Sequence, residues 1–277
     1  MKIRVAPSIG ELERSFEEAW NLKTYNPDKD SNEATVFVGI YGLPDFYSLW
    51  RHKGKKYIFW CGSDIRHLHN GYWLDDVGDI RISSGGIAKW INLNCESWVE
   101  NKVEHDTLSF LGIKSHICPS FLGDVNKIDV SYKYSEKPKL YTSVSGDDFG
   151  LYGWNDICDI ADQHPGIEFH FYGNTKPFKP LLNNINNNVI IHGRVSKEKM
   201  NKEIAEMQGA IRMVKFDGFS EIIAKSLLMG QWPVSSIEYP HTVPIREIAR
   251  IKELEKPNIM GREYYLNKLN KFPWTKK

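Results

Sequence analysis

Short runs of β-branched and aromatic residues alternate with helical patterns along this chain, and that alternation limits the folds open to it. In the first half, the strand candidates are residues 3–6, 35–40, 56–61, 80–83, 91–94 and 115–118. Gly, Pro, Asn and Asp residues bound many of these runs. Strands that alternate with helices are typical of βαβ units, whose strands run parallel in one sheet. The sequence therefore predicts an α/β fold.

The clearest helix candidate of this half covers residues 96–111. Its apolar residues recur at helix-like spacing and precede Gly112; they are Trp98, Val99, Val103, Leu108 and Leu111. Residues at this spacing line one face of a helix, and a glycine commonly ends it. We expect this helix to cover the first sheet.

The alternation starts again after a polar stretch, residues 124–139, which reads as a linker. The second half has strand candidates at 140–144, 167–172, 189–192, 210–214 and 234–236, and helix candidates at 154–163, 197–207 and 220–229. The length of 277 residues also exceeds what one core usually serves. We predict an N-terminal domain at 1–132 and a C-terminal domain at 133–258. A helix within 259–277 is expected to pack back toward the first domain.

Composition excludes several classes of protein. Hydrophobic residues make up 41 % and charged residues 26 %, and the net charge is +1, so nothing drives the whole chain toward nucleic acid or acidic lipid. No apolar run approaches the roughly 20 residues of a membrane-spanning helix. The N-terminus enters a strand pattern without the features of a secretion signal, and we expect a cytoplasmic protein.

The most informative segment runs from Arg212 to Glu221 and reads as a strand, a tight turn and a helix start. Gly218 permits a sharp turn, and Ser220 is a good residue to cap a helix. The amides of a first helical turn bind anions, and Arg212 and Lys215 beside them suit a diphosphate. For the turn alone, a plain capped connection in an α/β protein remains the alternative.

Part of this segment and a stretch that follows it resemble the donor-site signature of retaining GT-B glycosyltransferases of the group 1 type. They are the motif Asp-Gly-Phe-Ser at 217–220 and the stretch from 226–228 to Gly230 and Val234. The variant with Arg several residues before this motif occurs in bacterial and viral relatives. The similarity covers about residues 138–236, and the first half resembles the family only in architecture. The resemblance implies two Rossmann-like domains facing across a cleft.

The resemblance also assigns roles on the donor side. Gly218, Phe219 and Ser220 would contact the donor phosphates or sugar, and Asp217 would face the sugar hydroxyls. The donor-site residues it implies are Ser145, Gly146, Gly173, Arg212, Lys215, Gly218, Phe219, Ser220, Glu221 and Lys225. Lys225 stands where the family has a glutamate for the ribose, and Asp147 and Asp148 replace the usual basic residues after Ser145 and Gly146.

The first half offers a second turn, Gly62, Ser63 and Asp64, at the carboxyl end of a predicted strand, where open α/β sheets bind ligands. It resembles a turn that faces the cleft in this superfamily, and Asp64 would contact the acceptor or the transferred sugar. A helix-capping Asp64 is the equal alternative. Ser8 and Gly10 end the first strand similarly and are further acceptor-side candidates, although a bare turn explains them as well.

We expect no metal and no cofactor. His67 and His69 lie two positions apart, which does not place them on one face of a helix, and Asp75-Asp76 and Asp147-Asp148 are not the Asp-x-Asp metal signature. A Walker loop and a dinucleotide fingerprint are also absent from the sequence. The co-substrate implied by the resemblance is a nucleoside diphosphate sugar, with a UDP-sugar as the first choice.

The resulting prediction is a metal-independent, retaining hexosyl- or pentosyltransferase that uses a hydroxyl acceptor. A polysaccharide or glycolipid precursor is the first acceptor class. A hydroxymethylated pyrimidine in DNA, as in phage enzymes, is the alternative, and the basic loop from Arg51 to Lys56 would then meet phosphates. A non-catalytic GT-B-like binding module, with the donor site lost through Lys225, is the third possibility.

Overall fold

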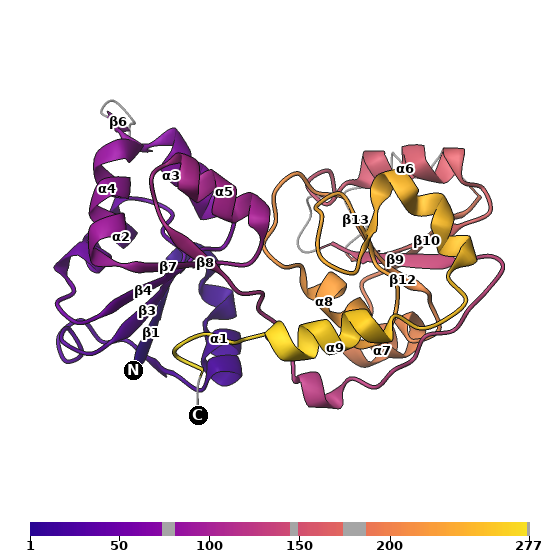
Figure 1. Ribbon diagram of the computed structural model, residues 1–277, viewed down its shortest axis with the longest axis horizontal. Coiled ribbons are helices and arrows are strands. Elements are labelled where there is room, and N and C mark those ends of the chain that lie inside the picture. Colours follow the sequence, from indigo (N-terminus) through magenta and orange to yellow (C-terminus); the bar gives the residue numbers. More distant parts are fainter. Residues whose placement is uncertain (74–80, 145–148, 174–186, 276–277) are drawn as a thin grey trace. The chain divides into compact units, whose positions relative to one another are not determined.

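A computed structural model of the chain describes residues 1–73, 81–144, 149–173 and 187–275 (Figure 1). The chain forms two compact units. Unit 1 comprises Met1–Asp124, Phe216–Phe219 and Lys268–Lys277, and unit 2 comprises Val125–Lys215 and Ser220–Asn267. Each unit contains a six-stranded sheet in which all the paired strands run parallel. The predicted α/β class is confirmed, and both units are Rossmann-like.

The sheet of unit 1 has the strand order β2-β1-β3-β4-β7-β8. The bounds are β1 Lys2–Val5, β2 Lys23–Thr24, β3 Thr35–Val38, β4 Lys56–Phe59, β7 Glu96–Val99 and β8 Ser115–Ile117. All four residues of β3 are buried, as expected of a central parallel strand that is covered on both faces. The two-residue β2, at the edge of the sheet, has no counterpart among the predicted strands.

Helices cover both faces of this sheet. They are η1 Pro7–Leu12, α1 Glu13–Trp20, α2 Leu43–Arg51, α3 Ser63–Asn70, α4 Ser84–Asn94 and α5 Lys102–Phe110. Figure 1 shows α2 to α5 on one side of the strands and α1 on the other. The α1 face is closed by the C-terminal residues Phe272 and Trp274, whose rings stack with centroids 4.6 Å apart. A two-stranded antiparallel pair, β5 Tyr72–Trp73 and β6 Arg81–Ile82, completes the described elements of unit 1.

Three sequence-based assignments in unit 1 need correction. Residues 91–94, predicted as a strand, are the last turn of α4, where Ile87, Ala88 and Ile91 face the core. The helix predicted at 96–111 is the strand β7 followed by the shorter helix α5. The strand predicted at 80–83 is reduced to β6, which pairs with β5 and lies outside the main sheet.

The sheet of unit 2 has the order β11-β10-β9-β12-β13-β14. Its strands are β9 Lys139–Ser143, β10 Glu168–Tyr172, β11 Val189–Gly193, β12 Gly209–Arg212, β13 Val234–Ser235 and β14 Val243–Pro244. The predicted strands of this half are present, and β14 is additional. Because β9 lies at the centre, the chain crosses from one half of the sheet to the other between β11 and β12, and open α/β sheets bind ligands where the strand order reverses.

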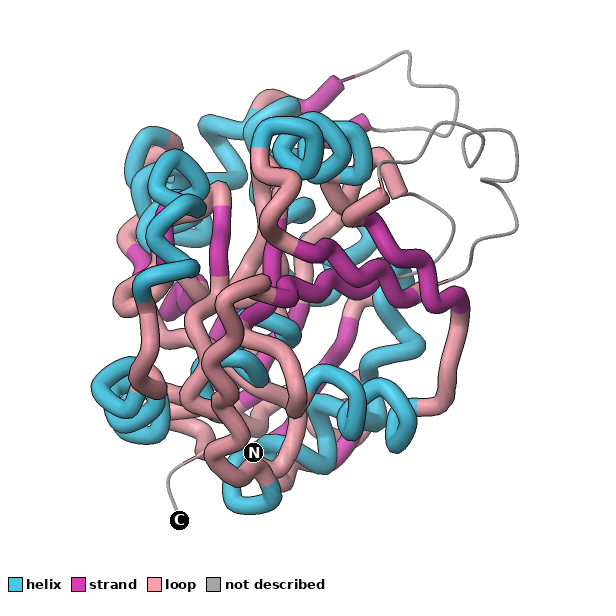
Figure 2. Tube along the Cα trace, turned by 90° about the vertical axis from the view of Figure 1, so that its right-hand side faces the viewer, coloured by secondary structure: helices cyan, strands magenta, loops and turns pink. Residues whose placement is uncertain are grey.

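The helices of unit 2 are η2 Val125–Lys127, α6 Trp154–Gln163, α7 Lys197–Ile204, α8 Glu221–Leu228, η5 Ile245–Glu253 and α9 Ile259–Lys268. The helices are cyan and the strands magenta in Figure 2. Trp154, Ile157 and Ala161 of α6 pack on β10 through Phe169 and Phe171. The helix predicted within residues 259–277 is α9, which covers the first ten residues of that range and ends at Lys268. No helix in the described ranges is long and apolar enough to cross a bilayer.

Candidate functional site

The connection from β12 to α8 carries two basic residues ahead of a helix N-terminus. Arg212, the last residue of β12, is 9 % exposed, and its guanidinium carbon lies 4.3 Å from the centroid of the Tyr152 ring. Lys215 follows on the surface. Ser220 stands at the N-cap of α8, but its side chain makes no capping hydrogen bond there. The segment therefore combines two basic residues with the partial positive charge of the helix N-terminus that follows them, and such a combination suits an anion such as a diphosphate.

The four residues before Ser220 are held by side chains of unit 1, to which Phe216–Phe219 belongs. The amide of Phe219 donates to Oε2 of Glu100 over 2.9 Å. Nδ2 of Asn101 donates to the carbonyl oxygens of Asp217, at 2.8 Å, and of Gly218, at 3.2 Å. Oδ1 of Asn101 also accepts from the amide of Glu104 and caps α5. The backbone of the predicted donor turn is therefore fixed by protein groups at three points.

These contacts also explain Gly218. A Cβ atom at this position would collide with the carboxylate of Glu100, so only glycine permits the carboxylate to reach the Phe219 amide. The resemblance had assigned Gly218 and Phe219 to backbone contacts with the donor. The amide of Phe219 is used inside unit 1, so a phosphate at this turn would meet the amides of α8 that follow it.

Three carboxyl groups gather near the carboxyl ends of β4 and β7. Burial raises the pKa of Glu100 to about 8, although hydrogen bonds from Ser120 and from the Phe219 amide act in the opposite direction. Glu104 is fully buried, and burial together with the nearby Glu100 holds its pKa well above the usual range. Oε1 of Glu104 has no hydrogen-bond partner among the described residues. The raised pKa values mean that Glu100 and Glu104 hold their protons to a higher pH than exposed carboxyl groups do.

Asp64 is the third of these carboxyl groups, and it is completely buried. It accepts hydrogen bonds from the amides of Ile40 at 3.0 Å and of Cys61 and Ile65 at 2.9 Å each. Burial raises its pKa to about 7 against these bonds. The Asp64 side chain therefore joins the ends of β3 and β4 to the start of α3, and it lies in the first turn of that helix, whose N-cap is Gly62.

The neighbours of Asp64 shape the same turn. Gly62 has a φ of +81°, and a Cβ there would lie 3.0 Å from Oε1 of Glu104 and 3.4 Å from the Gly218 amide nitrogen. Ser63 donates from Oγ to the Tyr41 hydroxyl at 3.3 Å. Gly62 is thus required both by its backbone conformation and by the close approach of the 216–219 turn.

The remaining donor-side candidates lie in unit 2. Gly173 ends β10 with a φ of +143°, and a Cβ there would be 2.8 Å from the carbonyl oxygen of Val144. Lys225 is half-buried in α8 and donates to Oδ1 of Asn201 at 2.9 Å, and burial lowers its pKa. Glu221 is in the first turn of α8. Ser145 and Gly146 lie outside the described residues.

Two groups of residues predicted on the acceptor side have a structural role that needs no ligand. Ser8 and Gly10 belong to the 3₁₀ helix η1, and a Cβ at Gly10 would meet nothing within 4 Å. In the basic loop from Arg51 to Lys56, two residues already have places in the fold: His52 is buried, and Lys55 forms an ion pair with Glu96 at 3.0 Å. The described part of the chain holds no group of three or more His, Cys, Asp or Glu residues that is arranged to bind a metal ion.

Sequence reasoning missed Glu100, Asn101 and Glu104. They follow β7, and polar residues directly after a buried parallel strand lie at the ligand-binding edge of a sheet. The sequence signal was the capping pattern Asn-x-x-Glu at 101–104. The prediction of one continuous helix across residues 96–111 concealed it.

Comparison with known proteins identifies the fold. No family model and no curated protein matches the sequence. Among solved structures, the lipopolysaccharide outer core galactosyltransferase WaaB superposes with a TM-score of 0.62 over 96 % of this chain and 79 % of WaaB, at 9 % identity. TarM gives 0.55 over 84 % of this chain and 50 % of TarM, at 13 % identity. HepE from Anabaena, solved with UDP and glucose, gives 0.54 over 84 % and 72 %, at 11 % identity.

WaaB and TarM are GT-B glycosyltransferases, and this chain has the fold that they share. The chain spans about half the length of TarM. At these sequence identities the likeness concerns the fold, and the chemistry has to be argued from the residues that follow the strands.

Proposed function

We propose that this protein is a glycosyltransferase that moves a sugar from a nucleoside diphosphate, UDP in the first instance, to a hydroxyl of a glycan or glycolipid precursor. The observation that carries the proposal is the β12–α8 connection, where buried Arg212 ends a strand and the chain leads on to a helix N-terminus that the Ser220 side chain does not cap. Structures of the same fold have been solved with UDP and a sugar, as for HepE. The combination of fold and anion site supports this reaction class over a simple binding module.

In the proposed reaction, the bond between the anomeric carbon and the diphosphate oxygen breaks. A bond to the acceptor oxygen forms, and the hydroxyl proton passes to the departing diphosphate. Negative charge grows on that diphosphate, and the α8 amides, Arg212 and Lys215 stabilise it. Because these groups are cationic or polar protein groups, the proposal requires no metal ion. Retention of the anomeric configuration follows from the resemblance of residues 217–220 and remains part of the proposal.

The carboxylates divide into two roles in this proposal. Asp217 is half-buried and is the acidic side chain assigned to the hydroxyls of the transferred sugar. Asp64 and Glu100 position the backbone, since their oxygens accept from the amides of Ile40, Cys61, Ile65 and Phe219. Lys225 stands where the resembled family has a glutamate for the ribose, and it donates a hydrogen bond to Asn201. Other groups would therefore bind the ribose.

The first test is thermal unfolding with UDP, GDP, ADP and their sugar conjugates. A ligand that binds only the folded state stabilises it by RT ln(1 + [L]/Kd), about 2.7 kcal/mol at a hundredfold excess over Kd. We expect one nucleoside diphosphate to raise the melting temperature, and mass spectrometry with that donor and mixed glycosides to reveal a transferred sugar. If no nucleotide raises the melting temperature, the binding-module alternative replaces the enzyme.

Two matched lysine variants test whether the nucleotide binds near the N-terminus of α8. Lys215→Gln removes an exposed charge next to the proposed diphosphate site, and Lys202→Gln removes an exposed charge from α7. We expect Lys215→Gln to weaken the nucleotide shift while Lys202→Gln leaves it unchanged. Equal effects of both variants would mean that only general surface charge is measured.

A further inference from the structure

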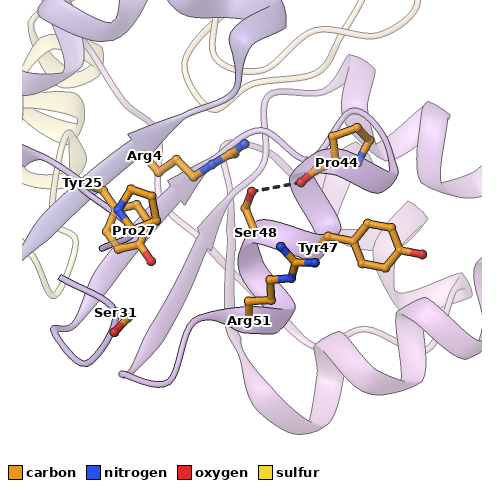
Figure 3. Close-up of a pocket in the computed structure, with 8 residues that line it drawn as sticks. All are labelled: Arg4, Tyr25, Pro27, Ser31, Pro44, Tyr47, Ser48 and Arg51. Atoms are coloured by element: carbon orange, nitrogen blue, oxygen red, sulfur yellow. Dashed lines mark hydrogen bonds between the residues drawn. The ribbon is translucent and has the colours of Figure 1, made fainter. Parts of the chain in front are cut away.

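A pocket of about 570 Å³ lies in unit 1, between the edge of the sheet and α2. Its lining comprises two arginines, two tyrosines, two serines and two prolines: Arg4, Arg51, Tyr25, Tyr47, Ser31, Ser48, Pro27 and Pro44. Figure 3 shows the guanidinium groups of Arg4 and Arg51 directed toward Ser48 from opposite sides in this view. Of these eight residues, only Arg51 entered the sequence-based predictions, as the first residue of the basic loop proposed to meet the phosphates of a DNA acceptor.

Arg4 is built into the wall of this pocket. It belongs to β1, where Ile3 and Val5 face the α1 side, so the alternation of a strand directs Arg4 toward α2. Its Nη2 donates to Oδ1 of Asp45 at 2.8 Å, and Oδ2 of Asp45 accepts from the amide of Tyr41. Nη1 of Arg4 is buried and has no hydrogen-bond partner in the part of the chain that the structure describes. Arg4 is therefore held in the pocket wall by Asp45, and the free charge of the pocket has to come from another residue.

Arg51 supplies the pocket's excess charge. It is the exposed last residue of α2, and no hydrogen bond or ion pair joins it to the described residues. The Arg4–Asp45 pair is neutral, so the lining carries one net positive charge from Arg51. A guanidinium fork binds the paired oxygens of a carboxylate or of a phosphodiester, each of which carries one negative charge.

The other walls are suited to a ring. Tyr25 and Pro27 follow β2, and Pro44 and Tyr47 come from the exposed side of α2, so aromatic and proline faces stand on both sides of the charged groups. Oγ of Ser48 donates to the Pro44 carbonyl at 3.0 Å and can still accept a hydrogen bond. Apolar faces beside a few directed polar groups are typical of small-molecule sites.

We infer that this pocket binds a saccharide unit that carries a single negative charge, as a carboxylate or a phosphodiester. The choice of a saccharide rests on the proposed function, and the charge and shape rest on the pocket. Along the sheet, β1 is two strands from β4 and three from β7, so it is separated laterally by about 10–15 Å from the strands that precede the Asp64 and Glu100 turns. A polymeric acceptor can therefore occupy this pocket with a unit remote from the one that receives the sugar.

Calorimetric titration of the full chain, without nucleotide, tests the pocket with three probes. These are methyl glucuronide, the methyl phosphodiester of glucose and methyl glucoside. We expect at least one anion to bind, the neutral glycoside to bind about tenfold more weakly or not at all, and added salt to weaken anion binding. The tighter of the two anions identifies the source of the charge. Equal binding of the neutral glycoside, or no binding of either anion, overturns the inference.

Three variants assign the binding to the pocket. We expect Arg51→Gln to weaken anion binding about tenfold, and Arg51→Lys, which keeps the charge but loses the fork, to be intermediate. Arg14→Gln, an exposed arginine of α1 outside the pocket, should leave binding unchanged. Unchanged binding in Arg51→Gln overturns the inference. Thermal shifts with UDP on the same samples separate the two claims. If UDP stabilises the protein but neither anion binds, only the inference about the pocket fails. If an anion binds but UDP does not stabilise the protein, only the proposed transferase function fails.

Discussion

The two units have the same architecture and opposite chemistry at the carboxyl ends of their strands. In unit 1, β4 and β7 are followed by the carboxyl groups Asp64, Glu100 and Glu104, whose pKa values are all raised by burial. In unit 2, β12 ends in the cationic Arg212. The carboxyl groups of unit 1 bind the protein's own backbone, whereas the cation of unit 2 precedes in the chain a helix N-terminus that its N-cap side chain does not bond. The difference shows that the parallel sheet places residues at the carboxyl ends of its strands, and that the identity of those residues determines which groups the site binds.

The strongest test of the contrast is the loss of the cation in unit 2. We expect Arg212→Gln to lower kcat for sugar transfer by about 10²–10³-fold, because one preorganised group would no longer stabilise the departing diphosphate. Steady-state kinetics measures this, with Arg250→Gln, an exposed arginine of η5, as the matched control. Arg212→Lys should recover part of the activity. A folded Arg212→Gln variant within twofold of the wild type would refute the role.

The opposite change removes a carboxyl group from unit 1. Glu100→Ala leaves the Ser120 and Phe219 amides without their acceptor, and we expect it to lower the free energy of unfolding by about 2–3 kcal/mol. Urea unfolding measures the loss. Glu18→Ala, an exposed carboxylate on α1, is the control that should remain within about 0.5 kcal/mol. A loss no greater than the control's would mean that Glu100 does not hold the turn.

The units should also respond to pH in opposite directions. Folding raises the pKa of Glu100 from 4.5 to about 8, so the folded state binds more protons and its stability falls as pH rises from about 4.5 to 8. Burial, with the neighbouring His192, lowers the pKa of His170 in unit 2 from 6.5 to about 4, so its contribution is lost as pH falls through that range. Each such proton changes stability by at most about 1.4 kcal/mol per pH unit.

Variants separate the two pH effects. Unfolding monitored from pH 4 to 9 should show a shallower alkaline slope in Glu100→Gln and a shallower acid slope in His170→Gln. A wild type whose stability does not change between pH 6.5 and 8, or slopes that both variants leave unchanged, would contradict the assignment.

The smallest expected effect concerns Lys225. Lys225→Glu introduces a carboxylate at the position where the resembled family has one, and we expect the KM for the nucleotide sugar to fall about fivefold through bonds to the ribose hydroxyls. Lys225→Gln removes the same charge without adding an acceptor of comparable strength. If both variants raise KM equally, Lys225 itself takes part in donor binding.

Much of the fold follows from the sequence because buried parallel strands are continuous apolar runs. β3, β4, β9 and β10 read in this way, and their turn residues separate them. The secondary-structure predictions were wrong where a short strand and a short helix follow each other directly. Residues 91–94 alternate apolar and polar side chains as a strand does, but the helix that contains them starts before Gly85 and Gly86, which weakened its pattern.

The site was harder to predict because its contacts are distant in sequence. Arg212, Lys215 and Gly218 stand out in one local segment, whereas the bond from the Phe219 amide to Glu100 spans 119 positions. No local pattern indicates that Gly218 is required by a carboxylate from another strand. The eight pocket residues come from β1, the segment after β2, and α2, and sequence spacing does not bring them together.

The most direct test of the central claim is a crystal structure of the full chain soaked with UDP. The account predicts diphosphate oxygens within about 3 Å of the first-turn amides of α8 and of the Arg212 guanidinium. A diphosphate bound elsewhere, with the N-terminus of α8 closed to it by protein side chains, would contradict the account.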